Sequence, residues 1–138
     1  VRQHLERDGV KIYVKFPSSA IPPVQAVPGE LEDVWLNLLL NAHDVLVAYD
    51  NGEIRIEVRY LRAEHMVAVS VSDNGPGIPE SVINDIFKPF FTTKPMGEGT
   101  GLGLHIARQA VERAGGTIQV RSDPQAGTRF MVLLPAQG

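Results

Sequence analysis

Three polar side chains in one predicted helix have the types and the spacing of a site for a hard cation. Asn37, Asn41 and Asp44 recur at i, i+4 and i+7, so a helix places them on one face. Asparagine is a poor helix former, so two of them among leucines lower the local stability of the helix. Their carboxamide oxygens suit Mg²⁺, which shares its oxygen ligands with substrate phosphates. The alternative is a solvated polar face, and helical geometry alone favours it.

A carboxylate at the end of an apolar strand is a second candidate. In "HMVAVSVSDNGPGI" the alternating valines of residues 67–71 share one strand face, and Asp73 falls on the same face. Burying a carboxylate is costly unless a donor reaches it. Gly75 and Gly77 follow and leave room for a flat ligand, so the exocyclic amine of a purine is a suitable donor. In the alternative interpretation, Asp73 only forms a turn with the amides of the Asn-Gly pair.

A second glycine cluster, "GEGTGLGL" at residues 97–104, opens another predicted helix. The first amides of a helix are unpaired donors at the positive end of its dipole. A glycine run there lets an anion approach closely, which predicts a phosphate site. The segment has neither the lysine of a P-loop nor the strand-turn-helix pattern of a dinucleotide fold. On these residues alone, a loop whose glycines only serve turns is an equally good interpretation.

Hydrophobic periodicity predicts the elements that must position these residues. Two long amphipathic helices are expected over 28–47 and 101–116, a short helix over 80–87, and strands over 10–16, 53–61, 65–73, 117–122 and 128–135. Neighbouring strands form hairpins, and the helices cover one face. The predicted fold class is therefore α+β, a two-layer α/β sandwich with a mixed, largely antiparallel sheet.

Composition limits the classes of function. The chain has 138 residues, no cysteine and a net charge of -3. The length suits one domain with its own core, and the charge gives no case for nucleic acid or an anionic membrane as the main partner. Without cysteine, a disulfide scaffold, a thiolate metal site and thiol catalysis are excluded. No apolar run approaches the roughly 18 to 20 residues that span a bilayer, and residues 1–10, "VRQHLERDGV", contain no hydrophobic signal segment.

Because the chain does not begin with methionine, we expect it to be a piece of a longer protein. The absence of cysteine is consistent with a reducing compartment. We therefore expect a cytoplasmic domain that makes no membrane contact itself, whether or not the parent protein is membrane-anchored.

Four segments together carry a resemblance to a known family. In order, "NLLLNAHDVL", "DNGPGI", "IFKPFFTTK" and "GEGTGLGLHIA" resemble the asparagine box, first glycine box, phenylalanine box and second glycine box of sensor histidine kinases. The resemblance covers residues 8–136 and implies the Bergerat, or GHKL, fold, which gyrase, heat-shock chaperone and mismatch-repair ATPases share. Residues 1–7 are interpreted as the remnant of a preceding segment. The wording of "NAHDVL" and "PFFTTK" is most similar to the nitrogen-regulation type of kinase.

The resemblance implies ATP and Mg²⁺ as cofactors and gives roles to single residues. Asn41 matches the metal-ligating asparagine, and Asn37 matches the first asparagine of the same box. Asp73 matches the aspartate that takes the adenine amino group, and Thr128 matches a hydroxyl of the adenine-water network. The implied nucleotide-binding set is Asn41, Asp73, Gly75, Gly77, Ile78, Lys94, Gly99, Thr100, Gly101, Leu102, Gly103, Leu104 and Thr128, and the implied catalytic set is Asn37, Asn41 and Lys94.

The segment between the glycine boxes, residues 88–103, matches the mobile loop called the ATP lid. Phe87, Phe90 and Phe91 match the phenylalanine box that anchors this lid, although such aromatic residues equally fill an ordinary core. Lys94 is a candidate cation for the terminal phosphates. The resemblance thus implies that "DNGPGI" makes room for the base and that "GEGTGLGL" wraps the phosphates.

Two positions depart from the family's pattern. The ATPases and serine kinases of this fold usually carry a glutamate four residues before the metal-ligating asparagine, and this chain has Asn37 there. A carboxamide cannot act as a general base, whereas positioning and charge neutralisation remain available for phosphoryl transfer. This favours transfer to an imidazole over hydrolysis. Asp44 stands where many members place a phosphate-contacting lysine, so Lys94 or a neighbouring domain must supply that charge.

The acceptor histidine is expected to lie outside this chain, because His4, His43, His65 and His105 are all interpreted as structural. The resemblance therefore implies the catalytic domain of a two-component sensor histidine kinase. Such a domain transfers the γ-phosphoryl group of ATP to a histidine of a separate dimerisation domain, for relay to the receiver domain of a response regulator. We expect a monomeric isolated domain and a homodimeric parent. A hydrolytic ATPase of the same fold and a non-catalytic nucleotide sensor remain alternatives.

Overall fold

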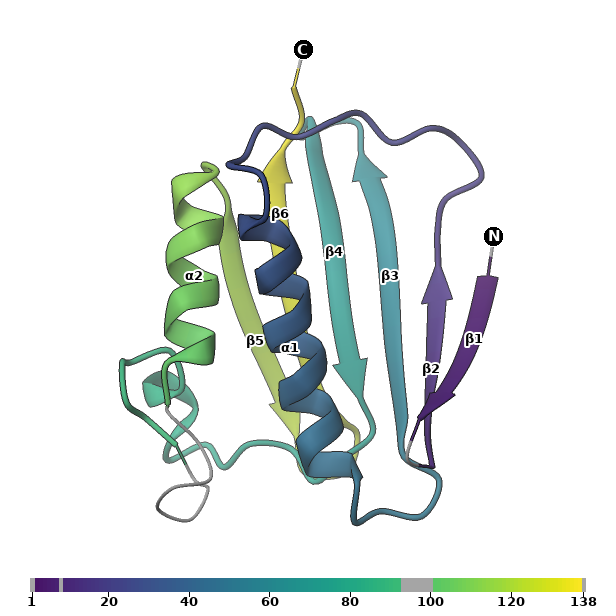
Figure 1. Cartoon of the computed structure of the whole chain (residues 1–138), viewed down its shortest axis with the longest axis vertical. Helices are drawn as coiled ribbons and strands as arrows, with labels where there is room; N and C mark the ends of the chain where they lie inside the picture. The colour runs from purple at the N-terminus through teal and green to yellow at the C-terminus, as the bar shows by residue number, and fades with distance from the viewer. Residues whose placement is uncertain (1, 8, 93–100, 138) are drawn as a thin grey trace.

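The computed structural model describes the backbone of residues 2–7, 9–92 and 101–137, and the side chains from residue 9 onward within those ranges. In these residues one sheet and two α-helices form two layers (Figure 1). The elements are β1 Arg2–Arg7, β2 Val10–Lys15, α1 Glu30–Leu46, β3 Glu53–Leu61, β4 Met66–Asp73, the 3₁₀ turn η1 Ile83–Asp85, α2 Gly103–Arg113, β5 Thr117–Asp123 and β6 Gly127–Pro135.

The sheet is mixed and largely antiparallel, as the sequence predicts. Its strand order is β1-β2-β3-β4-β6-β5, and β2 and β3 form its parallel pair. That pair is joined by the crossover that contains α1, whereas β3–β4 and β5–β6 are antiparallel hairpins. Both helices lie side by side on one face of the sheet, and β1 and β2 extend beyond them (Figure 1). The expected two-layer α+β sandwich is therefore confirmed.

A stripe of apolar side chains fixes α1 to the sheet. Val34, Leu38, Ala42 and Leu46 follow one another at four-residue intervals and are all buried. Full burial of a leucine or valine side chain contributes roughly 1.5 to 3 kcal/mol. The neighbouring face of α1 carries Asn37 and Asn41, and Asn37 lies against Gly103 at the start of α2.

The two helices pack closely through small side chains and are tied at one end by an ion pair. Ala107 and Ala110 of α2 are buried between the layers. Arg113 at the end of α2 donates to the Glu30 carboxylate at the start of α1, with Nη2 to Oε1 at 2.9 Å. An acidic residue at a helix start and a basic residue at a helix end both suit the helix dipoles.

The structure differs from the sequence-based prediction at several element ends. Only η1 forms where a helix over 80–87 was predicted, since β-branched residues and an Asn-Asp pair weaken a short helix there. α1 begins after Gly29, which has φ +88°, and α2 begins after Gly101, which has φ +70°. A residue with positive φ cannot continue a right-handed helix, so both helices are shorter than predicted.

The N-terminal boundary also differs. Residues 2–7, where we expected only the remnant of a preceding segment, form β1 and pair antiparallel with β2 from Arg2↔Lys15 to Arg7↔Val10. The stretch "RQHLER" has no period-two apolar alternation, so hydrophobic periodicity does not predict a strand there. In the part of the chain that the structure describes, no helix is both long and apolar enough to cross a membrane.

Candidate functional site

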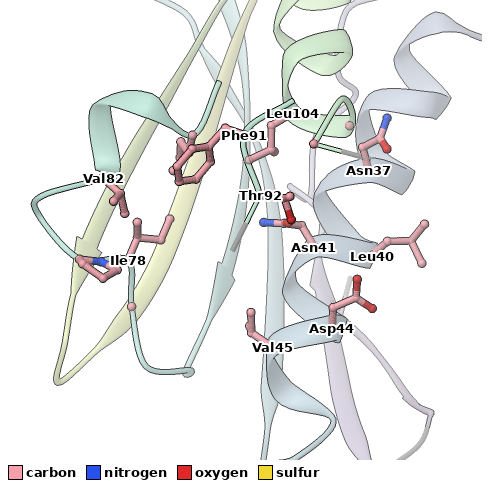
Figure 2. A pocket seen from close by; sticks show the side chains of 15 residues that line it. Asn37, Leu40, Asn41, Asp44, Val45, Ile78, Val82, Phe91, Thr92 and Leu104 are labelled. Atoms are coloured by element: carbon pink, nitrogen blue, oxygen red, sulfur yellow. The ribbon is translucent and has the colours of Figure 1, made fainter. Parts of the chain in front are cut away.

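A cavity of about 430 Å³ opens between α1 and the segment that follows β4. Figure 2 shows Asn37, Asn41 and Asp44 projecting from α1 on one side, with Ile78 and Phe91 on the other. The lining comes from four segments: Asn37, Leu40, Asn41, Asp44 and Val45 of α1; Gly77, Ile78, Pro79, Val82 and Ile86 after β4; Phe91 and Thr92; and Gly101, Gly103 and Leu104 at the start of α2.

The three polar residues of α1 thus line one cavity wall rather than a face turned only to solvent. Asn37 and Asn41 are half-buried, whereas Asp44 is exposed at the rim. Two carboxamides and a carboxylate present oxygen donors, which are the ligands Mg²⁺ takes in proteins. In residues 9–92 and 101–137, no cluster of three His, Cys, Asp or Glu side chains could hold a metal ion. Among these residues, the asparagines are therefore the candidate metal ligands.

Asp73 ends β4 as a half-buried carboxyl. Burial raises its pKa above the ordinary value, while hydrogen bonds from the backbone amides of Gly75 and Thr128 act in the opposite direction. The Gly75 amide donates to Oδ1 over 2.9 Å, so the bond expected of a turn former is present. Because the burial effect exceeds that of these two bonds, a further donor to this carboxyl is energetically favourable.

Asp73, Gly75 and Thr128 are not among the residues that line the cavity. A Cβ at Gly75 would come within 3.0 Å of Asp73 Oδ1 and 3.5 Å of Cγ2 of Val45, which does line the cavity. A Cβ there would also lie 3.3 Å from Cδ2 of Leu46. Gly75 therefore packs tightly between Asp73 and the α1 residues Val45 and Leu46, and a larger residue would press on the Asp73 carboxyl.

Two of the glycines are required by backbone geometry. Gly77 has φ +79°, and a Cβ there would lie 2.9 Å from the Asp123 carbonyl oxygen and from Ser122 Oγ. At Gly101, with φ +70°, a Cβ would overlap the backbone of Phe90. Both substitutions are strained. The glycines thus hold the two glycine-rich segments against neighbouring backbone at the cavity.

The start of α2 lies against the asparagine face of α1. A Cβ at Gly103 would come within 3.0 Å of Asn37 Oδ1, so the first residue of α2 packs against the side-chain amide of Asn37 in α1. Gly101, Gly103 and Leu104 line the cavity, and Leu102 is the residue before the first turn of α2. Three expected residues, Lys94, Gly99 and Thr100, lie outside the described residues.

The predicted phenylalanine box is only partly assembled. The Phe87 ring packs edge-on against Phe130 of the core, with centroids 6.1 Å apart, and its carbonyl accepts a hydrogen bond from His105 Nδ1 at 3.3 Å. Phe91 lines the cavity. Phe90 is 73% exposed, so it does not join the other two.

One residue of the site was missed at the level of sequence. Ser122 Oγ accepts a hydrogen bond from the Ile78 amide at 2.5 Å and lies 3.2 Å from Thr128 Oγ1. It connects the first glycine box to the β5–β6 hairpin. A signal was present, because Ser122 follows Ile118 and Val120 on the inward face of β5, where a polar residue needs a partner.

Comparison with known proteins identifies the family. Residues 26–138 match the model of the histidine kinase-, DNA gyrase B- and HSP90-like ATPases. The chain belongs to this family. The sensor histidine kinase ZraS of Escherichia coli strain K12 is 40% identical over 126 residues, which are 91% of this chain and 26% of ZraS. The resemblance read from the four boxes is confirmed at the level of the family.

Solved structures agree with this assignment. The nucleotide-free catalytic domain of the histidine kinase ThkA matches with a TM-score of 0.77 and 32% identity, over 95% of this chain and 83% of that one. Full-length ShkA in complex with AMPPNP matches with a TM-score of 0.79 and 29% identity, over 95% of this chain and 27% of that one. The chain spans only 13% and 26% of the first two curated relatives.

Proposed function

We propose that this domain binds ATP and is the catalytic domain of a two-component sensor histidine kinase. It transfers the γ-phosphoryl group to a histidine on a separate dimerisation domain. The observation that supports this most directly is the shared cavity: the asparagine face of α1, the turn at Gly77–Ile78 and the glycine-rich start of α2 all line it. ZraS is a sensor histidine kinase and ThkA is a histidine kinase, and ShkA was solved in complex with AMPPNP, an ATP analogue.

The base is proposed to lie near the end of β4. Asp73 accepts a hydrogen bond from the adenine amino group, which supplies the donor that its buried carboxyl lacks. Gly77 and Ile78 line the cavity beside this position, and Ile78 gives the flat ring an apolar contact. Thr128 lies beside Asp73 in the β4–β6 register and offers a hydroxyl to the same base edge.

The phosphates are proposed to lie between α1 and the start of α2. The first amides of α2, over Gly101, Leu102, Gly103 and Leu104, donate to phosphate oxygens at the positive end of the helix dipole. Lys94, Gly99 and Thr100 are assigned to the phosphates from the resemblance alone. These contacts position the terminal phosphate and offset its charge.

The oxygen donors of α1 fit Mg²⁺, with Asn41 as the proposed ligand and Asn37 one helical turn before it. When bound, the cation neutralises charge on the phosphate oxygens. Asn37 cannot accept a proton, so the domain orients the phosphate and leaves nucleophilic attack to the incoming imidazole. This division of tasks explains why an acid–base residue is not needed on α1.

The proposed partners follow from this role. They are ATP, the histidine-bearing dimerisation domain of a homodimeric parent and, through it, the receiver domain of a response regulator. The isolated domain is proposed to be monomeric and cytoplasmic. Its assignment to the nitrogen-regulation subgroup is a hypothesis that rests on the sequences "NAHDVL" and "PFFTTK".

Incubation with γ-labelled ATP, Mg²⁺ and the separately produced histidine-bearing domain of the parent tests the proposal. The expected product is a labelled partner domain whose phosphate is lost in acid and kept in base, as for phosphohistidine. ATP binding without any such transfer would favour a nucleotide sensor. Absence of ATP binding would overturn the proposed function altogether.

A further inference from the structure

One face of the sheet carries no helix in the part of the chain that the structure describes. Figure 1 shows α1 and α2 together on the other face. Val67, Val69 and Val71 of β4 pack into the core on the helix side, so the alternate residues of β4 point away from the helices. Register partners on neighbouring strands share a face, which assigns the remaining side chains. We call the surface without helices the open face.

The two central strands are apolar on the open face. A sheet face that meets water normally carries polar residues, and the open-face residues of the edge strand β5 are indeed Thr117, Gln119, Arg121 and Asp123. In contrast, β6 contains the unbroken apolar run "FMVLL", and its partner β4 begins with "MVAV". Such runs are typical of strands that are covered on both faces. The centre of the open face therefore has the composition of a covered surface.

The side chains concerned lie next to one another. Leu133 of β6 is the register partner of Ala68 of β4, and Met131 is two residues before Leu133 on the same side. Met131 and Leu133 are only half-buried, because no helix packs over them in the described residues. Neighbouring apolar side chains left open in this way mark a contact surface, whereas single ones do not.

A row of arginines borders this apolar centre. One line of register partners crosses the open face: Arg55 of β3, Ser72 of β4, Arg129 of β6 and Arg121 of β5. All three arginines are exposed. Arg121 and Arg129 stand directly opposite each other, and like charges in this arrangement lower the stability of a sheet. Arg55 pairs with Glu53 at 3.2 Å, but neither Arg121 nor Arg129 forms an ion pair with any residue that the structure describes.

The other carboxylates of the open face already have partners. Glu57 pairs with Lys15 at 3.7 Å, and Asp123 accepts a hydrogen bond from the backbone amide of Gln125 at 2.8 Å. The chain as a whole has a net charge of -3, so the excess of positive charge at Arg121 and Arg129 is local. This pair therefore lacks an anionic partner next to a surface that lacks a cover.

We propose that the open face is a docking surface for a partner protein that presents an acidic amphipathic helix. The apolar stripe of that helix packs on Met131 and Leu133, and its carboxylates pair with Arg121 and Arg129. An apolar centre with a charged rim, rich in methionine and arginine, is the usual composition of a protein interface. This inference does not rest on the proposed nucleotide site, since α1 and the start of α2 line that cavity.

The geometry and the charge favour a helix over other occupants. Neighbouring strands lie about 4.8 Å apart. Side chains at i and i+4 of a helix are about 5 to 6 Å apart, so two glutamates one turn apart match Arg121 and Arg129. A second copy of this chain is disfavoured, because its open face would bring the same positive charge. An anionic membrane is a poorer match, because the chain is negatively charged overall and the apolar side chains do not project.

The test uses the whole chain and a labelled helical peptide of about 20 residues, which is long enough to be helical alone. The peptide has a leucine stripe flanked by glutamates at i and i+4. Two matched peptides carry lysine for every glutamate, or serine for every leucine. Fluorescence anisotropy should show binding of the first peptide that weakens with added salt, and much weaker binding of the other two. Equal binding of either matched peptide would overturn the proposal.

Arg129→Glu should weaken binding of the acidic peptide roughly three- to tenfold, through lost attraction and added repulsion. The same change places opposite charges across from each other, so the urea midpoint should rise. Arg108→Glu is the matched control, because Arg108 is an exposed residue of α2 in the helix layer and the change in net charge is equal. It should leave the affinity unaltered. Equal weakening by the two variants would reduce the effect to net charge and overturn the proposal.

Met131→Gln tests the apolar part, since it keeps the length of the side chain and makes it polar. It should weaken the acidic peptide, and unaltered affinity would contradict the proposed contact. Vesicles of phosphatidylcholine and phosphatidylserine test the membrane, and sedimentation of the free protein tests a second copy. We expect neither binding nor self-association. Vesicle binding lost in Arg129→Glu, or a dimer lost in Met131→Gln, would overturn the assignment to a partner helix.

Discussion

At the scale of single residues, the Asp73 carboxyl is the proposed hydrogen-bond acceptor for the base, but its burial in the ionised form lowers the stability of the fold. Burial raises the pKa of this carboxyl above its ordinary value of 3.8 in spite of two amide hydrogen bonds. A carboxyl with a raised folded-state pKa favours folding while it is protonated. That contribution is fully present below the unfolded pKa and is lost as pH rises through the folded pKa. At neutral pH the ionised group is therefore held in the fold at a cost in stability.

Asp73→Asn should separate these two effects. ATP affinity should fall by roughly 1 to 3 kcal/mol, because an amide mispairs with the adenine amino group. In the absence of nucleotide, the stability of the unaltered protein relative to the variant should decline as pH rises from 3.8 through the folded pKa. Calorimetry and thermal unfolding across pH measure both. Unchanged ATP affinity in a folded variant would remove Asp73 from the site.

Asn41→Ala tests the proposed metal ligand. Asn41 is half-buried and lies outside the buried stripe of α1, and alanine is the better helix former, so the fold should persist. Mg²⁺-dependent phosphoryl transfer should be abolished. Leu36→Ala, at an exposed position of the same helix outside the cavity lining, is the control and should transfer normally. Transfer by Asn41→Ala at saturating ATP and Mg²⁺ would contradict the ligand role.

The sequence predicted the placement of a side chain where the pattern lies within a single helix or strand. The helical period alone placed Asn37 and Asn41 together, and strand parity alone placed Asp73 on the inward face. Ser122 was missed because its role depends on the register of β5 against β6 and on the return of the Gly77–Ile78 turn. The parity of β5 marks Ser122 as a polar residue on the inward face, but it does not identify a partner 44 positions away in the chain.

At the scale of elements, α1 both contributes four buried side chains to the core and forms one wall of the site. Leu38 is completely buried in the stripe that holds α1 against the sheet, one residue after Asn37. Leu38→Ala should lower the free energy of unfolding by roughly 2 to 5 kcal/mol, through lost burial and the cavity left behind.

Leu36→Ala provides the comparison within the same helix, because Leu36 is 53% exposed. Its effect on the free energy of unfolding should stay within about 0.5 kcal/mol. Urea denaturation of both variants measures the difference. Equal destabilisation by the two changes would mean that α1 does not pack with the register described above.

The sequence predicted the existence of the long elements better than their ends. Strong periodicity marked both helices, since their apolar stripes are continuous. The starts of α1 and α2 depend on the backbone angles at Gly29 and Gly101, and glycine alone does not reveal the sign of φ. β1 was missed because an edge strand with mostly polar residues is held by its backbone pairing with β2.

At the scale of the whole molecule, the topology brings the base end and the phosphate end of one cavity together from distant parts of the chain. α1 precedes β3, the first glycine box follows β4, and the second opens α2. The parallel β2–β3 pair requires a crossover connection, which contains α1, and the asparagines of α1 line the same cavity as Gly77 and Ile78 of the first glycine box. The sequence could predict the two layers and the hairpins β3–β4 and β5–β6, but not the pairing of β2 with β3 or of β4 with β6.

The whole site also predicts what the domain does alone. General-base assistance contributes roughly 10² to 10⁴ in rate, and α1 carries Asn37 where related ATPases carry a glutamate. The isolated domain should therefore bind ATP, hydrolyse it very slowly and not label itself. Asp44 is the one carboxylate among the described lining residues, so Asp44→Asn is the informative variant. It should leave the slow hydrolysis unchanged, measured as phosphate release at saturating ATP and Mg²⁺. Brisk turnover that Asp44→Asn abolishes would instead identify a hydrolytic ATPase with Asp44 as its base.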